Sequence, residues 1–191
     1  MFETDAWPFI PAKWVRHPAT PRTVLWIVIH STESLEVEGG AREIARYFQN
    51  PPRPGSSHVV VDDKETIQCV HDSDIAAGAV GANNSGIHIE QIGTAAQTLA
   101  QWQDEYSQAV ITRAADVVAQ YCLKYDLPVI FLSAADLQTG KKGITTHAQV
   151  SLAFPGTGHT DPGESYPIDD FLAQVQTAYD TRKAAHQPDN A

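Results

Sequence analysis

The 191-residue chain contains no apolar run long enough to cross a membrane. Its best run, Val24 to Ile29, has the length of a strand, whereas a membrane helix needs about 18 apolar residues or more. The N-terminus also lacks a basic segment followed by an apolar one, so we expect no secretory signal peptide. Cysteine is scarce: Cys69 and Cys122 lie far apart and form no CxxC pair. The sequence therefore argues against a disulfide framework and predicts two buried thiols.

Basic residues are few as well. Lys and Arg together number 13 against 23 Asp and Glu, which gives a formal net charge of −10. A nucleic-acid partner is therefore not expected, because phosphate binding needs clustered Lys and Arg. Adhesion to anionic membranes or anionic wall polymers by charge alone is disfavoured for the same reason. The length and the hydrophobic share of 42% suit one globular domain with one core.

Hydrophobic patterning predicts strands that interleave with helices. Strands are expected at residues 24–29, 58–61, 66–70, 87–92 and 128–131, and helices at 41–48, 102–125 and from Ile168 onward. Residues 71–85 and the glycine-rich stretch after residue 131 are expected to be loops. The predicted fold class is α/β, with a mixed central β-sheet flanked by helices. Residues 1–22 are interpreted as an N-terminal arm, 23–182 as one catalytic domain, and 183–191 as a polar tail or the start of a linker.

Three residues far apart in the sequence are candidate metal ligands. His30 ends a hydrophobic strand, a place where catalytic groups collect in α/β folds. His147 follows a short Gly-Ile-Thr-Thr segment, and Asp161 lies in a His-Thr-Asp-Pro-Gly turn. Each alone also fits a purely structural role, as a histidine at a sheet edge or an aspartate in a turn. Together, two histidines and one carboxylate suit an open site for one Zn²⁺ per chain, with a position left for water.

An ordered set of motifs resembles the type 2 N-acetylmuramoyl-L-alanine amidases, a family that includes phage endolysins and peptidoglycan-recognition proteins. The set is His-Ser-Thr at 30–32, Gly-Ile-His-Ile-Glu at 86–90, Thr-His at 146–147, and His-Thr-Asp-Pro-Gly at 159–163. It spans roughly residues 23 to 180 and looks most like the amidase domain of endolysins from mycobacteriophages and other actinobacteriophages. The resemblance implies the peptidoglycan-recognition-protein-like fold and a zinc held by His30, His147 and Asp161.

The same resemblance assigns catalytic roles. Glu90 falls where related recycling enzymes place a catalytic glutamate, and it is expected to act as the general base. His159 stands where many members carry a lysine that stabilises the oxyanion; a histidine there predicts pH dependence near neutrality. Ser57 stands where phage lysozyme relatives carry an active-site tyrosine.

Three further residues are expected near the substrate. His88 replaces a glycine of the usual Ile-Gly-Ile-Glu pattern and shares a sheet face with Glu90, so it is a candidate for substrate contact or for the surroundings of the metal. His58, on the neighbouring strand, and Ser57 are also predicted to bind substrate. The remaining histidines are interpreted as surface or structural residues: His17, His71 and His186.

The resemblance implies hydrolysis of the amide between N-acylmuramic acid and L-alanine in bacterial peptidoglycan or its muropeptides. The expected context is a phage endolysin that stays in the host cytoplasm until release and then acts on the cell wall. A cytoplasmic muropeptide-recycling amidase and a non-catalytic peptidoglycan-binding module remain alternatives. No membrane insertion is expected, and a monomer is favoured.

Overall fold

The computed structural model describes residues 4–156 and 158–186, and a five-stranded mixed sheet forms its centre. The strands lie in the order β4-β3-β6-β2-β7. β6 pairs in parallel with β2 and β3, β2 pairs in parallel with β7, and only β4 runs antiparallel, in a hairpin with β3. The strand bounds are β2 (Trp26–Ser31), β3 (Val59–Val61), β4 (Thr66–Gln68), β6 (Gly86–Gln91) and β7 (Gly143–Thr146). The predicted mixed sheet is confirmed.

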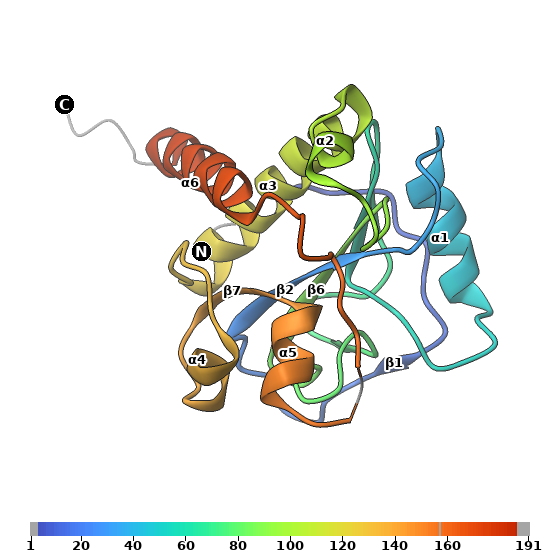
Figure 1. The fold of residues 1–191 in the computed structure, drawn as a ribbon. Helices are drawn as coiled ribbons and strands as arrows, with labels where there is room; N and C mark the ends of the chain where they lie inside the picture. The colour runs from blue at the N-terminus through green and yellow to red at the C-terminus, as the bar shows by residue number, and fades with distance from the viewer. Residues whose placement is uncertain (1–3, 157, 187–191) are drawn as a thin grey trace.

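Helices cover both faces of this sheet (Figure 1). They are α1 (Gly40–Gln49), α2 (Leu99–Trp102), α3 (Glu105–Tyr125), α4 (Ala134–Gln138), α5 (His147–Ala153) and α6 (Ile168–Ala185). The long helix α3 packs on one face and α6 packs against α3, whereas α1, α4 and α5 lie over the other face. Among the described helices, none is long and apolar enough to span a membrane.

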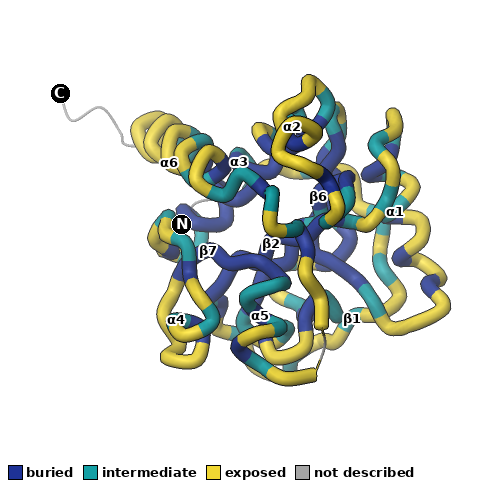
Figure 2. Tube along the Cα trace, viewed as in Figure 1, coloured by how far each residue is buried: buried dark blue, intermediate teal, exposed yellow. Residues whose placement is uncertain are grey.

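Alternation along the strands decides which side chains meet which helices. Ile27, Ile29, Ile87 and Ile89 point into the core beneath α3 and α6. Their even-numbered neighbours face the opposite side, where Val28 packs near α4 and α5. Both faces are covered, so the strands at the centre of the molecule are almost wholly buried (Figure 2). This explains why Val24 to Ile29 reads as one continuous apolar run rather than an alternating one.

The strand register brings the candidate site residues together on the even-numbered face. His30 on β2 is paired with Glu90 on β6, and Val28 is paired with His88. Thr146, the last residue of β7, is paired with Ile29, so His147 follows directly beside His30. Because β2, β6 and β7 are parallel, their carboxyl ends meet at one edge of the sheet, and the site forms there.

The expectation of a long loop after residue 131 is wrong in part. It contains α4, β7 and α5, and the strand expected at 128–131 is reduced to an isolated bridge between Phe131 and Ile144. These elements are short, and Gly140, Gly143 and Gly156, which lie within or near them, obscured their periodicity. The stretch 71–85 likewise contains β5 (Ile75–Ala76), which pairs with β1 (Val15–Arg16) of the N-terminal arm.

Both ends of the chain can be compared with the expected boundaries only in part. Helix α6 continues to Ala185, beyond the expected domain end at 182, and residues 187–191 of the expected tail lie outside the described residues. The cysteine prediction is confirmed, because Cys69 and Cys122 are free and buried.

Candidate metal centre and catalytic cleft

His30 is placed by strand β2, whose six residues are all buried. Its side chain is 2% exposed, and its two ring nitrogens face different partners. Nδ1 lies 3.0 Å from Oδ2 of Asp161, and Nε2 lies 3.0 Å from Nδ1 of His88. The ring is therefore fixed from both sides, with Nδ1 turned to the carboxylate.

Two further segments bring their side chains to the same point. His147 is the first residue of α5, and its Nδ1 lies 3.1 Å from Oδ1 of Asp161. The amide of Ala148 donates to the carbonyl of Asp161, which ties the start of α5 to this turn. Gly163 closes the turn at φ +99°, and a Cβ there would lie 2.1 Å from the carbonyl oxygen of Ala95. Only glycine fits that position, so the turn and its carboxylate are held in one place.

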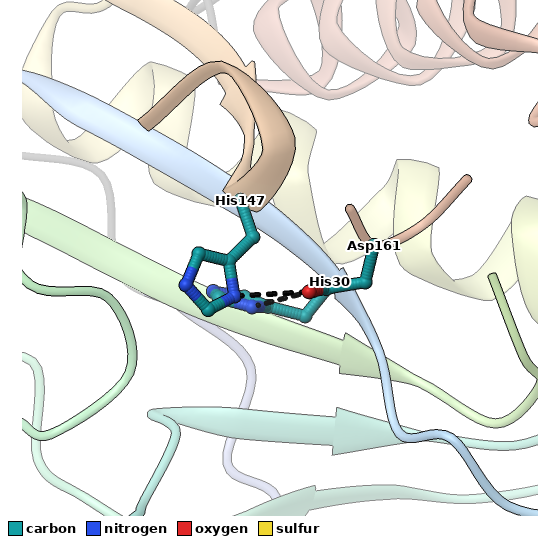
Figure 3. Close-up of side chains that lie close together, drawn as sticks. All are labelled: His30, His147 and Asp161. Carbon is teal, nitrogen blue, oxygen red and sulfur yellow. Dashed lines mark hydrogen bonds and ion pairs between the residues drawn. The ribbon is translucent and has the colours of Figure 1, made fainter. Parts of the chain in front are cut away.

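These three side chains form one compact donor set (Figure 3). Each of His30, His147 and Asp161 is buried, and each offers a ligand atom within 4.8 Å of the other two. Zinc bonds of about 2.0–2.2 Å would put the donors of a tetrahedral site roughly 3.3–3.5 Å apart. The nitrogens of His30 and His147 lie 3.0 and 3.1 Å from different oxygens of Asp161. With one oxygen as the ligand, small adjustments of the three side chains would bring the donors to the tetrahedral spacing.

The protonation states of Asp161 and His147 also suit metal binding. Burial alone would raise the pKa of Asp161, but its close contacts with the rings of His147 and His30 outweigh this effect and hold that pKa well below its usual range. Burial lowers the pKa of His147, although its hydrogen bond to Asp161 partly opposes this. An ionised carboxylate and a neutral imidazole are the forms that bind zinc.

A cavity of about 270 Å³ opens directly over the three donors. Glu90 lines it, and its Oε2 is buried without a hydrogen-bond partner among the described residues. Burial, together with the nearby negative charges of Asp161 and Glu33, raises the pKa of Glu90 well above its usual value. A carboxyl group with a raised pKa beside a metal centre is suited to take up and release a proton during catalysis.

His159 stands at the mouth of the same cavity. Its side chain is 55% exposed, and its ring stacks on that of His147 with centroids 4.1 Å apart. Burial and the neighbouring His147 lower the pKa of His159. The neutral ring is therefore the main form at neutral pH, and it can still donate a hydrogen bond.

The opposite wall comes from residues that the motifs did not indicate. Helix α1 contributes Ile44, Tyr47 and Phe48, so one side of the cavity is apolar. Glu33 lies at the rim with φ 56°, and its Oε1 accepts hydrogen bonds from the Ser31 hydroxyl and the Ala95 amide. No motif marks these positions; the amphipathic pattern of α1 predicted the helix but not what its exposed edge faces.

Comparisons with known proteins agree with this geometry. The family profile described as N-acetylmuramoyl-L-alanine amidase matches residues 20–164. The chain belongs to this amidase family. A search of curated protein sequences found no match.

Solved structures with the same fold include amidases and endolysins. The Staphylococcus aureus hydrolase AmiA in complex with its ligand aligns with a TM-score of 0.66 and 19% identity, covering 95% of this chain and 87% of its own. A mutant endolysin from Bacillus subtilis aligns with a TM-score of 0.59 and 22% identity, covering 87% of this chain and 95% of its own. The amidase LysC from Clostridium intestinale aligns with a TM-score of 0.56 and 15% identity, covering 91% of this chain and 99% of its own. These similarities confirm the predicted amidase type 2 fold.

The structure corrects the expectation that Ser57, His58 and His88 bind substrate in this amidase. All three are 0% exposed, and none lines the cavity. They lie one layer below it: His88 contacts the far side of His30, and His58 stacks on His88 at 5.7 Å. Strand alternation correctly predicted the face of His88 but could not predict that other residues cover it.

Proposed function

We propose that this chain is a zinc-dependent peptidoglycan amidase that hydrolyses the amide between N-acylmuramic acid and L-alanine. The observation that carries the proposal is the convergence of His30, His147 and Asp161, buried side by side, on the floor of a cavity that Glu90 also lines. Membership of the amidase family supports the same bond and substrate class. One zinc ion per chain would be held by the three residues.

When bound, zinc supplies Lewis-acid chemistry that polarises the scissile carbonyl and acidifies water beside it. Glu90 takes the proton from the attacking water and returns it to the nitrogen of L-alanine as the carbon–nitrogen bond breaks. Its raised pKa suits both steps, because the group must accept a proton and then release it. His159 donates a hydrogen bond to the oxygen on which negative charge develops.

The cavity also has features suited to the two methyl groups that flank this amide, one on the lactyl unit and one on alanine. We assign them to the apolar wall formed by Ile44, Tyr47 and Phe48. Tyr47 is 51% exposed, so its ring is available to a ligand. Apolar contact there would orient the substrate while the polar groups on the other wall act on the carbonyl.

For the biological role we propose host-cell lysis by a phage endolysin. Solved structures that share the fold include an endolysin from Bacillus subtilis, which supports this role. Intact sacculi and soluble muropeptides, offered separately, test it. Faster cleavage of intact sacculi is expected, whereas a strong preference for soluble anhydro-muropeptides would favour a recycling amidase.

Metal analysis and product analysis test the activity itself. We expect about one zinc per purified chain and, by mass spectrometry of digested peptidoglycan, free stem peptides that begin with L-alanine. A chain that binds no zinc or releases no stem peptides would refute the proposal and favour a binding module.

Two substitutions test the assigned roles. Glu90→Gln keeps the shape of the side chain but cannot accept the proton, so turnover should fall about 10²- to 10⁴-fold with zinc still bound. His159→Ala should lower turnover by roughly 10-fold or more, and zinc content should again be unchanged. A zinc-loaded variant that cleaves like the wild type would remove that residue from the mechanism.

A further inference from the structure

A second layer of imidazoles lies beneath the proposed metal centre. His88 is fully buried, and its Nδ1 lies 3.0 Å from Nε2 of His30. Asp161 faces the other nitrogen of the same His30 ring. His88 thus contacts the proposed ligand on the side away from the metal position, where a substrate has no access. The inference that follows rests on the zinc site proposed above.

The backbone of His88 is fixed by the segment that leads into β3. Its carbonyl accepts hydrogen bonds from the amide of His58, at 3.0 Å, and from the hydroxyl of Ser57, at 2.7 Å. Its amide donates to Nδ1 of His58, also at 3.0 Å. Three hydrogen bonds therefore hold the backbone of His88, which sets the direction in which its side chain leaves the strand.

The protonation pattern of His58 follows from these contacts. Because Nδ1 of His58 accepts the amide hydrogen of His88, the proton of the neutral ring is on Nε2, which lies 3.2 Å from the carbonyl of Asp74. Burial and the nearby charge of Arg22 lower the pKa of His58 to about 3, which keeps the ring neutral. The guanidinium of Arg22 donates to the carbonyls of Asp74 and Gly86 and closes this layer.

The surroundings of His88 leave room for its ring and for little else. A Cβ at Gly78 would lie 2.5 Å from Cγ of His88, and one at Gly86 would lie 3.2 Å from its Nε2. That Nε2 atom is buried and has no hydrogen-bond partner among the described residues. The contact with His30 is therefore the one hydrogen bond that the described residues provide to this side chain.

We propose that His88 is a positioning residue for the metal centre, with its Nδ1 accepting the Nε2 hydrogen of His30. This contact fixes the orientation of the His30 ring and keeps its proton on Nε2, so that Nδ1 is free to bind metal. Metal-binding histidines generally donate the N–H hydrogen of their second ring nitrogen to a carboxylate, a carbonyl or water. Here a buried imidazole takes that place, and Ser57 and His58 support it from behind.

Zinc affinity, measured by competition with a chromogenic chelator, tests this role independently of catalysis. His88→Leu fills a similar volume but removes the acceptor, and we expect its zinc dissociation constant to rise 10- to 100-fold. His88→Asn offers its Oδ1 close to the position of Nδ1, and we expect it to stay within about threefold of the wild type. Val175→Ala, on the buried face of α6, is the matched control for lost stability and should bind zinc like the wild type.

Two results would overturn the inference: wild-type zinc affinity in His88→Leu, or equally weak binding in His88→Asn and His88→Leu. Should His88→Leu fail to fold, the comparison of His88→Asn with His88→Ala decides, because alanine removes the acceptor without added bulk. If His88→Ala binds zinc weakly and His88→Asn does not, the role is supported. If the two variants bind zinc with equal affinity, it is refuted. A wild-type protein that binds no zinc would instead refute the proposed function.

Discussion

Cys69 and Cys122 illustrate how strongly the interior controls single side chains. Burial raises the pKa of each thiol from 9.0 to about 12, and for Cys69 the negative charge of Glu90 adds to the effect. Only the thiolate reacts, so at pH 8 the native protein should resist a disulfide reagent, whereas two thiols per chain should react in denaturant. Rapid labelling of native protein at pH 8 would contradict the burial of these groups.

The same shift has a consequence for stability. Between pH 9 and 12 the unfolded thiols lose their protons while the native thiols keep them. The native state then binds more protons, so the free energy of unfolding should fall as the pH rises through this window. Replacing both cysteines with serine removes this contribution. Urea unfolding of the wild type and the double variant at pH 8 and 10 measures the difference in the free energy of unfolding.

Single residues also mark the limit of what the sequence reveals. His30, His147 and Asp161 could be predicted because ordered motifs identify them, and the structure brings them together. Ser57 and His58 could not be assigned correctly, because their burial depends on chain segments distant in sequence that cover the sheet. Periodicity reports the face on which a side chain lies, not what covers that face.

At the level of elements, the loop before β6 is matched to the ring of His88. The φ of Gly78 lies outside the left-handed region, but an added methyl group would meet Cγ and Nδ1 of His88 at 2.5 and 2.6 Å. We therefore expect Gly78→Ala to push the His88 ring away from His30 and to weaken zinc binding, although Gly78 is not one of the three proposed ligands. Chelator competition on the purified variant measures the effect.

A double-mutant cycle supplies the control for this prediction. If the methyl group acts through His88, Gly78→Ala should have little further effect on zinc affinity in a His88→Ala background, because the space is then free. Additive losses in the double variant would mean that the loop acts on the metal centre by another route.

The elements themselves were predictable where they are long. The helix α3 and the strands β2 and β6 carry strong periodic or continuous apolar patterns, and they lie where expected. The short β7 and α5 were missed because four and seven residues carry too little periodicity beside flanking glycines. His147 therefore appeared to be a loop residue, although it begins a helix at the end of a strand.

At the scale of the whole molecule, the proposed zinc would join three segments that are far apart along the chain. His30 belongs to strand β2, His147 to the start of α5, and Asp161 to the turn before α6. Unfolding separates them, so zinc should bind the native state far more tightly than the unfolded chain. A ligand with this preference stabilises the native state by about 2.7 kcal/mol at 100 times its dissociation constant.

We therefore expect the melting temperature to fall when zinc is removed with a chelator and to recover when zinc is restored. For a chain of this length, about 2.7 kcal/mol corresponds to a shift of roughly 5–10 °C. Differential scanning calorimetry measures it, and Asp161→Asn, which lacks the charged carboxylate, should lose most of the zinc-dependent part of the shift. Equal melting temperatures with zinc and with chelator would mean that the three side chains hold no metal in the native protein.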